Sequence, residues 1–177
     1  MDYTIRMAGL EDAEEIYALI RRVHSEMPDK SLFALDEWED LPYFRELLSW
    51  KGGGAAAVAP DGTIAGVLVT RVPGEKGNLG ADIGLTEEEL PRVIHMEYSV
   101  VAPLHRGHGL ERRLLAFLDE REELRDYPIH MCTVAPDNPA SLSSVLANGY
   151  EIAATKKKYG GYTRHILIRR VRSSSAL

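Results

Sequence analysis

The sequence lacks several features that would place it in other classes of protein. It has one cysteine, Cys132, so no disulfide can form within the chain, which is typical of a reducing compartment. No apolar run approaches the roughly 20 residues that a membrane-spanning helix needs. Segment 1–15 turns acidic at once and has no basic stretch followed by an apolar one, so it does not resemble a secretory signal. We therefore predict a cytoplasmic protein without a membrane partner.

Positive charge is also scarce. The chain has 21 Lys and Arg against 27 Asp and Glu, a net charge of −6, whereas a nucleic-acid surface needs clustered Lys and Arg. We predict no nucleic-acid partner. His105 and His108 are three residues apart, but no further Cys, His or Asp cluster joins them, so we expect no metal. Cys132 stands among apolar strand residues without a paired base, and we interpret it as a core residue.

The 177 residues suit one domain, which we predict to span 1–177. Apolar periodicity predicts helices over 10–27, 36–50, 109–125 and 136–149. It predicts strands over 2–8, 52–60, 63–72, 92–101 and 127–134, and a hairpin over 150–171 that turns at Gly160 and Gly161. In the glycine-punctuated insertion 73–90, Thr86 and Glu89 have the capping-box spacing of a short helix. The tail 172–177 is expected to be frayed. This order predicts an α/β fold, a mixed sheet with helices on both faces.

The stretch "PLHRGHGLERRLL" (103–115) places two glycines between a strand and a helix. A phosphate-binding P-loop would need a lysine and a hydroxyl after its last glycine. A dinucleotide fingerprint would need a third glycine where Arg112 stands. Two interpretations remain open from the loop alone. Free N–H groups at the helix start could bind a pyrophosphate with help from Arg106, or the loop is a plain turn.

The wider segment "SVVAPLHRGHGLERRLL" resembles the acetyl-CoA signature of the GNAT superfamily of N-acetyltransferases. That signature is a strand ending in V-x-P, then [RQ]-x-x-G-x-[GA], then a leucine-rich helix. The matching residues are Arg106, Gly107, His108, Gly109 and Leu110, while Glu111 stands at the final small position. "NLGADIGLTEEEL", "PDNPASL" and "YGGYTR" resemble a bacterial subgroup whose loop ends in GLQ. The resemblance implies a GNAT acyl-CoA N-acyltransferase fold, with about seven mostly antiparallel strands and about four helices on both faces.

The resemblance also implies acetyl-CoA as co-substrate and direct transfer of its acetyl group, in a ternary complex, to a primary amine of a small molecule or peptide. Backbone N–H groups near Ser99, Val100 and Val101 would stabilise the thioester oxygen. Residues 106–111 would hold the pyrophosphate, with the Glu111 side chain pointing away and its N–H facing it. Asn138 would contact the pantetheine arm, although its role as a helix N-cap also suffices to explain it.

Glu97 is the candidate general base. It lies on the strand that leads to the glycine loop, among apolar neighbours that would raise its pKa. A solvated or salt-bridged strand residue is the alternative, and His95 is the second candidate. Val145 occupies the position of the family's usual acid, a tyrosine. Tyr159 or Tyr162 could replace it, or the thiolate could leave without an acid.

The acceptor is expected to be recognised by segment 27–50 and by the insertion 74–91. The acidity of the first segment favours a cationic amine, through Asp36, Glu37, Trp38, Glu39, Asp40 and Tyr43. Lys156, Lys157 and Lys158 could reach the nucleotide's phosphate or merely be solvated. Rival functions are an acyl-CoA-binding regulatory module without turnover, a transferase for a longer acyl-CoA and, more distantly, an NAD-binding fold. We expect a monomer or a homodimer.

Overall fold

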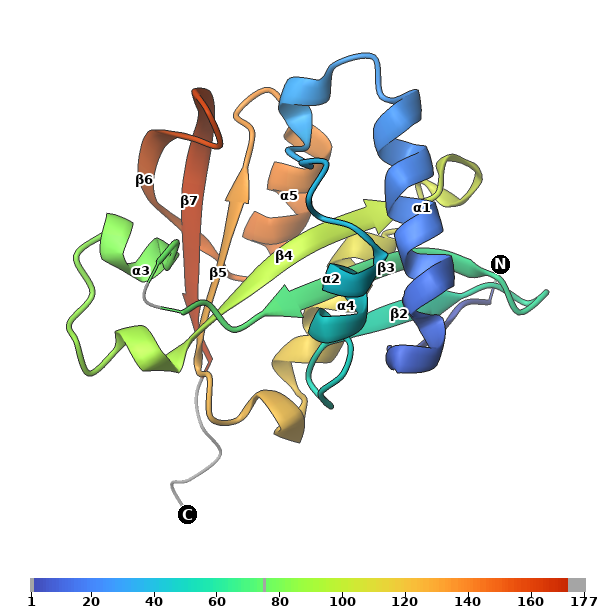
Figure 1. Cartoon of the computed structure of the whole chain (residues 1–177), viewed down its shortest axis with the longest axis horizontal. Coiled ribbons are helices and arrows are strands. Elements are labelled where there is room, and N and C mark those ends of the chain that lie inside the picture. Colours follow the sequence, from blue (N-terminus) through green and yellow to red (C-terminus); the bar gives the residue numbers. More distant parts are fainter. Residues whose placement is uncertain (1, 75, 172–177) are drawn as a thin grey trace.

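The computed structural model describes residues 2–74 and 76–171, so the tail 172–177 lies outside the described residues. One sheet contains seven strands in the order β1-β2-β3-β4-β5-β7-β6 (Figure 1). The strands are β1 Thr4–Met7, β2 Gly54–Val58, β3 Ile64–Arg71, β4 Val93–Val101, β5 Ile129–Val134, β6 Glu151–Lys158 and β7 Tyr162–Arg170. Neighbours pair antiparallel except β4 and β5, which are parallel. The predicted sheet is confirmed.

Helices cover both faces of this sheet, as predicted. They are α1 Ala13–Glu26, α2 Leu41–Leu47, α3 Leu79–Asp82, α4 Leu110–Asp119 and α5 Pro139–Ala147. The apolar sides of α1 and α2 form one core against β2–β4, centred on Ile16, Ile20 and Phe44. Helices α4 and α5 form the other core, around Leu114 and Val145. Because both faces are covered, the central strands are apolar almost throughout. Among the described residues, no helix combines the length and apolar character that crossing a bilayer requires.

Three predicted helices are wrong in extent. The second begins only at Leu41, because the side chain of Asp40 caps it by accepting a hydrogen bond from the N–H of Tyr43 at 3.1 Å. In the insertion, Thr86 and Glu89 form both capping-box hydrogen bonds, but only a turn and the 3-10 helix Leu90–Arg92 follow, and the α-helix forms earlier with Asn78 as N-cap. Helix α4 ends at Asp119, and a separate 3-10 turn buries Leu124.

The sheet opens between its two parallel strands. Their register includes only Val93, Ile94 and His95 of β4, opposite Ile129–Met131 of β5. Beyond that point the strands diverge (Figure 1), while β4 still pairs with β3 as far as Val101. A register shift leaves Glu97 without a partner on β3. The divergence therefore leaves an open space in the sheet, and the glycine loop follows at the end of β4.

Candidate active site

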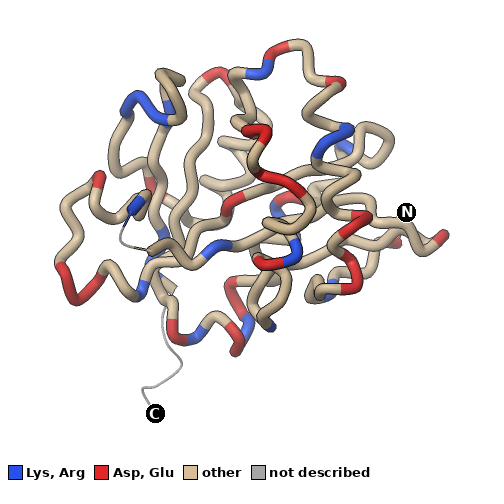
Figure 2. The backbone as a smooth tube through the Cα atoms, in the orientation of Figure 1, with Lys and Arg blue, Asp and Glu red and all other residues tan. Residues whose placement is uncertain are grey.

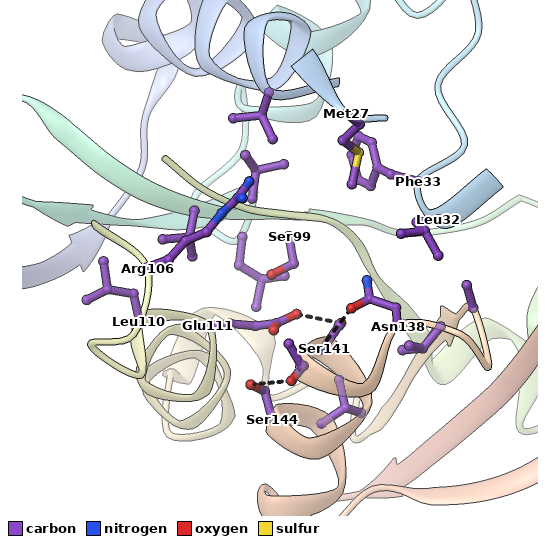
Figure 3. Close-up of a pocket in the computed structure, with 18 of the residues that line it drawn as sticks. Met27, Leu32, Phe33, Ser99, Arg106, Leu110, Glu111, Asn138, Ser141 and Ser144 are labelled. Atoms are coloured by element: carbon purple, nitrogen blue, oxygen red, sulfur yellow. Dashed lines mark hydrogen bonds between the residues drawn. The ribbon is translucent and has the colours of Figure 1, made fainter. Parts of the chain in front are cut away.

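A cleft of about 760 Å³ occupies the space between the diverging strands (Figure 3). Its walls come from β4, β5, the glycine loop, the first turn of α4, helix α5 and the segment after α1. Many apolar side chains and a smaller number of polar ones line it, which is typical of small-molecule sites. The cleft brings together most of the residues predicted to bind the co-substrate.

The glycine loop lies at one end of the cleft. Gly107 and Gly109 have φ values of +80° and +66°, a conformation in which glycine is favoured because it has no Cβ. Gly109 is the N-cap of α4 and has no side chain to satisfy the first N–H groups of the helix, which therefore remain available to an anion. Arg106, Leu110 and Glu111 also line the cleft. His108 is not among the lining residues, and its ring packs against Tyr3 with centroids 5.4 Å apart.

Ser99, Val100 and Val101 line the cleft along the part of β4 that β5 does not pair. The side-chain oxygen of Asn138 accepts a hydrogen bond from the N–H of Ser141 at 3.3 Å and caps α5. Asn138 also lines the cleft, so its position suits both roles that the sequence allows.

Glu97 lies in the cleft wall, but its predicted raised pKa is wrong. Burial alone would raise the pKa of Glu97. The hydrogen bond from His95 and the positive charge of Arg71 outweigh burial and hold the pKa below its ordinary value. The Arg71 Nε lies 3.2 Å from Glu97 Oε1, and His95 Nδ1 lies 3.2 Å from Oε2. The alternative interpretation, a salt-bridged strand residue, describes this carboxylate correctly.

His95 is buried and does not belong to the cleft lining. The N–H of Leu79 donates to its Nε2 at 3.1 Å, so in the neutral ring the proton lies on Nδ1, which faces Glu97. With both ring nitrogens engaged, His95 orients Glu97 and cannot itself meet an acceptor amine. The prediction of His95 as second candidate base does not fit this geometry.

The candidate acids differ in position. Val145 is buried and lines the cleft, so the usual tyrosine position is apolar. Tyr159, at φ +51°, places its hydroxyl 3.1 Å from the hydroxyl of Thr133, which lines the cleft. Tyr159 is 47% exposed and is not itself a lining residue. Partial burial of its hydroxyl raises the pKa of Tyr159, so it keeps its proton at neutral pH. Tyr162 packs near the Arg164 guanidinium at 5.4 Å and is no lining residue.

From the sequence, the side chain of Glu111 was expected to point away from the pyrophosphate, and in the structure it extends from α4 toward α5. It lines the cleft and accepts a hydrogen bond from the hydroxyl of Ser141 on α5 at 2.8 Å (Figure 3). Cys132 on the neighbouring strand β5 is buried. Burial raises the pKa of its thiol, which agrees with a core residue rather than a nucleophile.

The acidic residues proposed for acceptor recognition do not line the cleft. Figure 2 shows acidic residues along the loop between α1 and α2, but the lining from this region is Met27, Pro28, Asp29, Leu32 and Phe33. Glu39 is buried and accepts a hydrogen bond from the hydroxyl of Tyr98, which holds it inside the fold. The acidic lining residues are Glu26, Asp29, Glu97 and Glu111.

Two other predicted contacts are absent from the cleft. The insertion packs beside His95 through Leu79 and contributes no lining residue among those described. Lys158 forms an ion pair with Asp82 at 2.6 Å, and Lys156 donates to the carbonyl of Asp82, so these lysines connect β6 to the insertion.

No group of three or more metal-binding side chains occurs among residues 2–74 and 76–171.

Sequence reasoning missed two arginines that arrange the site. Arg71 on β3 pairs with Glu97, and the buried Arg164 on β7 donates to the carbonyl of Ser31, next to the lining residue Leu32. Arg71 belongs to no motif, and Arg164 ends the stretch YGGYTR, in which no role was predicted for it. Each arginine acts on a residue at least 26 positions away in the sequence, so no local pattern reveals these contacts.

The comparisons with known proteins agree with this fold and cleft. The model of the family described as "Acetyltransferase (GNAT) family" matches residues 14–149, which is most of the chain. The chain therefore belongs to the GNAT family of acetyltransferases. This result confirms the resemblance, the fold and the acyltransferase class predicted from the sequence. No curated protein sequence matches the chain significantly.

Three solved structures share the fold at low sequence identity. Diaminobutyrate acetyltransferase from Paenibacillus lautus, in complex with L-2,4-diaminobutyric acid and coenzyme A, has 16% identity and a TM-score of 0.70, with 99% of each chain covered. A putative acetyltransferase from Salmonella typhimurium with acetyl-CoA has 18% identity and a TM-score of 0.68, covering 100% of this chain and 98% of that one. A phosphinothricin acetyltransferase from Sinorhizobium meliloti with acetyl-CoA has 17% identity and a TM-score of 0.67, covering 100% and 92%. Their bound ligands agree with the co-substrate predicted from the sequence.

Proposed function

We propose that this protein transfers the acetyl group of acetyl-CoA to a primary amine of a small, cationic acceptor. The observation that carries the proposal is the cleft between β4 and β5, which ends at the glycine loop and at the free N–H groups of α4. A pyrophosphate suits that end because the helix dipole and the unsatisfied N–H groups favour an anion there. The opened sheet leaves room for an extended arm along Ser99–Val101.

The reaction needs a nucleophile, a stabilised oxyanion and a proton balance. The acceptor nitrogen attacks the thioester carbon, a C–N bond forms and the C–S bond breaks, which gives an amide and free CoA. Unpaired backbone N–H groups of β4 stabilise the oxygen as negative charge develops. In this proposal, Glu97 takes the amine proton through water, His95 orients it, and Tyr159 supplies a proton to the leaving thiolate.

The charge of the cleft supports a cationic acceptor. Glu26, Asp29 and Glu97 all line it, and the lowered pKa of Glu97 keeps that carboxylate ionised at neutral pH. Phe33 and Leu32 lie beside Asp29 and offer apolar contact. A small amine with a short carbon chain fits this combination of charge and apolar surface. Diaminobutyrate is the substrate in one protein of the same fold.

Calorimetric titration with acetyl-CoA, CoA and NAD tests the donor site. We expect acetyl-CoA and CoA to bind with dissociation constants on the order of micromolar, and NAD not to bind. A screen of diamines, amino sugars and basic peptides, read by release of free CoA thiol, then tests the acceptor class. Binding of NAD alone, or of none of the three, would overturn the donor assignment. Turnover of neutral or acidic acceptors only would overturn the acceptor assignment.

One observation favours a second function, a CoA-binding regulatory module without turnover. Val145 places an apolar side chain where an acid would serve the thiolate. This alternative predicts binding of acetyl-CoA and CoA with no thiol release for any amine tested. A longer acyl-CoA as donor predicts instead that turnover appears only when the acyl chain is lengthened.

A further inference from the structure

Glu111 introduces a carboxylate into the cleft at the first turn of α4. The signature that this loop resembles has a small residue at that position, whereas here a side chain extends from the helix toward α5. Its Oε1 accepts a hydrogen bond from the Ser141 hydroxyl at 2.8 Å, and Ser99 lies on β4 above it (Figure 3). The Ser99 hydroxyl is buried and forms no hydrogen bond of normal length within the described residues. The carboxylate therefore lies inside the space proposed for the donor.

The groups around this carboxylate do not neutralise it. Burial raises the pKa of Glu111, and the hydrogen bond from the Ser141 hydroxyl only partly opposes that effect. Its contacts are hydroxyls rather than cations, in contrast with the paired Glu97. The other titratable groups that line the cleft are Arg106 and His105 from the loop, Glu97 from β4, Cys132 from β5, and Glu26 and Asp29 from the end of α1.

In the free protein, Glu111 occupies a favourable position. An acidic residue in the first turn of a helix interacts with the positive end of the helix dipole. A pyrophosphate bound at the same N–H groups would use the same interaction. The carboxylate and the pyrophosphate thus compete for the positive end of α4. The pyrophosphate would also bring negative charge close to the Glu111 carboxylate, and water screens this repulsion poorly because the carboxylate is buried.

We propose that Glu111, a residue of the donor site, couples the binding of acetyl-CoA to the uptake of a proton. This inference rests on the proposed function, because it requires a pyrophosphate at the glycine loop. When Glu111 is protonated, its carboxyl group accommodates acetyl-CoA. When Glu111 is ionised, its negative charge weakens the binding of acetyl-CoA. Donor binding is therefore tightest at acidic pH and weakens as the pH rises through the pKa of Glu111.

The test compares Glu111→Gln with the wild type in titrations with acetyl-CoA. Glutamine keeps the size of the side chain and removes its charge. At about pH 8 we expect the variant to bind about tenfold more tightly than the wild type, and the difference should shrink as the pH is lowered and the carboxylate is protonated. Because both proteins bind the same ligand, titration of the ligand's own phosphate cancels in the comparison. Titrations in two buffers of different ionisation enthalpy should register more proton uptake for the wild type than for the variant.

Two further variants keep the test specific. Glu120→Gln makes the same chemical change at the exposed end of the same helix and should leave both the affinity and its pH dependence at wild-type values. Ser141→Ala removes the hydroxyl that favours the ionised form, so the pH at which binding weakens should move upward.

The outcomes separate this inference from the function on which it rests. Equal affinities and equal pH slopes for wild type and Glu111→Gln would overturn the role of Glu111 while leaving the donor site intact. Failure of the wild type and of Glu111→Gln to bind acetyl-CoA at any pH would overturn the donor site and the inference together.

Discussion

The two ends of the cleft hold their carboxylates in opposite ways. Glu97 has a guanidinium and an imidazole as partners, and its pKa is lowered although it is buried. Glu111 is also buried, but its partners are hydroxyls, and its pKa is raised. Residue type and burial are similar at the two positions. The charge of the neighbours therefore decides the direction of each shift, and with it the part that each carboxylate can play.

The first prediction removes the charge at the Glu97 end. Glu97→Gln should lower kcat by about a hundredfold or more, because the amine proton loses its acceptor. The dissociation constant for acetyl-CoA should stay within about twofold of the wild-type value, because the donor contacts lie along the other part of the cleft. Steady-state kinetics and calorimetry measure the two quantities. A variant with wild-type kcat would show that Glu97 only stabilises the strand.

The second prediction concerns Arg71, whose replacement would leave Glu97, like Glu111, without a guanidinium partner. Arg71→Met removes the cation, so the pKa of Glu97 should rise and the free energy of unfolding should fall by about 2 kcal/mol at neutral pH. A carboxyl whose folded pKa is lowered stabilises the protein above its unfolded pKa and loses that contribution as the pH falls. The difference from wild type should therefore shrink in acid, as denaturant titrations across pH would measure.

Arg71→Lys is the matched control for this prediction, because it keeps the positive charge. It should retain more of the stability at neutral pH than Arg71→Met does. Equal losses for both variants, independent of pH, would point to packing rather than charge as the role of Arg71.

The third prediction concerns Tyr159, which lies nearer the Glu97 end. Tyr159→Phe should lower kcat by about tenfold, since a thiolate can also leave by taking a proton from water. Thr133→Val, which removes the hydroxyl partner of Tyr159 at 3.1 Å, should have a smaller effect. An unchanged kcat in Tyr159→Phe would assign proton delivery to solvent alone.

The smallest expected effect lies at the Glu111 end. Asn138→Ala removes the N-cap of α5, the helix that carries Ser141, and should cost about 1 kcal/mol of stability. Asn138→Asp keeps a capping oxygen and should cost less. Thermal unfolding measures both variants. A larger loss of acetyl-CoA affinity in Asn138→Ala than in Asn138→Asp would support a second, direct role in donor binding.

Local sequence signals predicted the backbone around the glycine loop and the start of α5. Gly107 and Gly109 indicated a tight turn between strand and helix, and Asn138 before a proline indicated a helix start, because these signals depend on the residue's own backbone. The order of strands and helices, which is also read from local patterns, predicted the α/β class. These features need no knowledge of distant contacts.

The errors fall where distant residues decide the outcome. The pKa of Glu97 depends on Arg71, 26 positions earlier on a neighbouring strand, and the alternation of β4 does not indicate that partner. The direction of the Glu111 side chain depends on Ser141, 30 residues later. The acidic run near Glu39 was assigned to the cleft by composition, whereas the path of the loop brings Asp29 there instead.

A crystal structure of the complex with acetyl-CoA tests the central claim most directly. We expect the pyrophosphate within hydrogen-bonding distance of the backbone N–H groups between Gly107 and Glu111. The pantetheine arm should run between β4 and β5, past Ser99 and Asn138. Acetyl-CoA bound at another surface, with the cleft unchanged, would contradict the account.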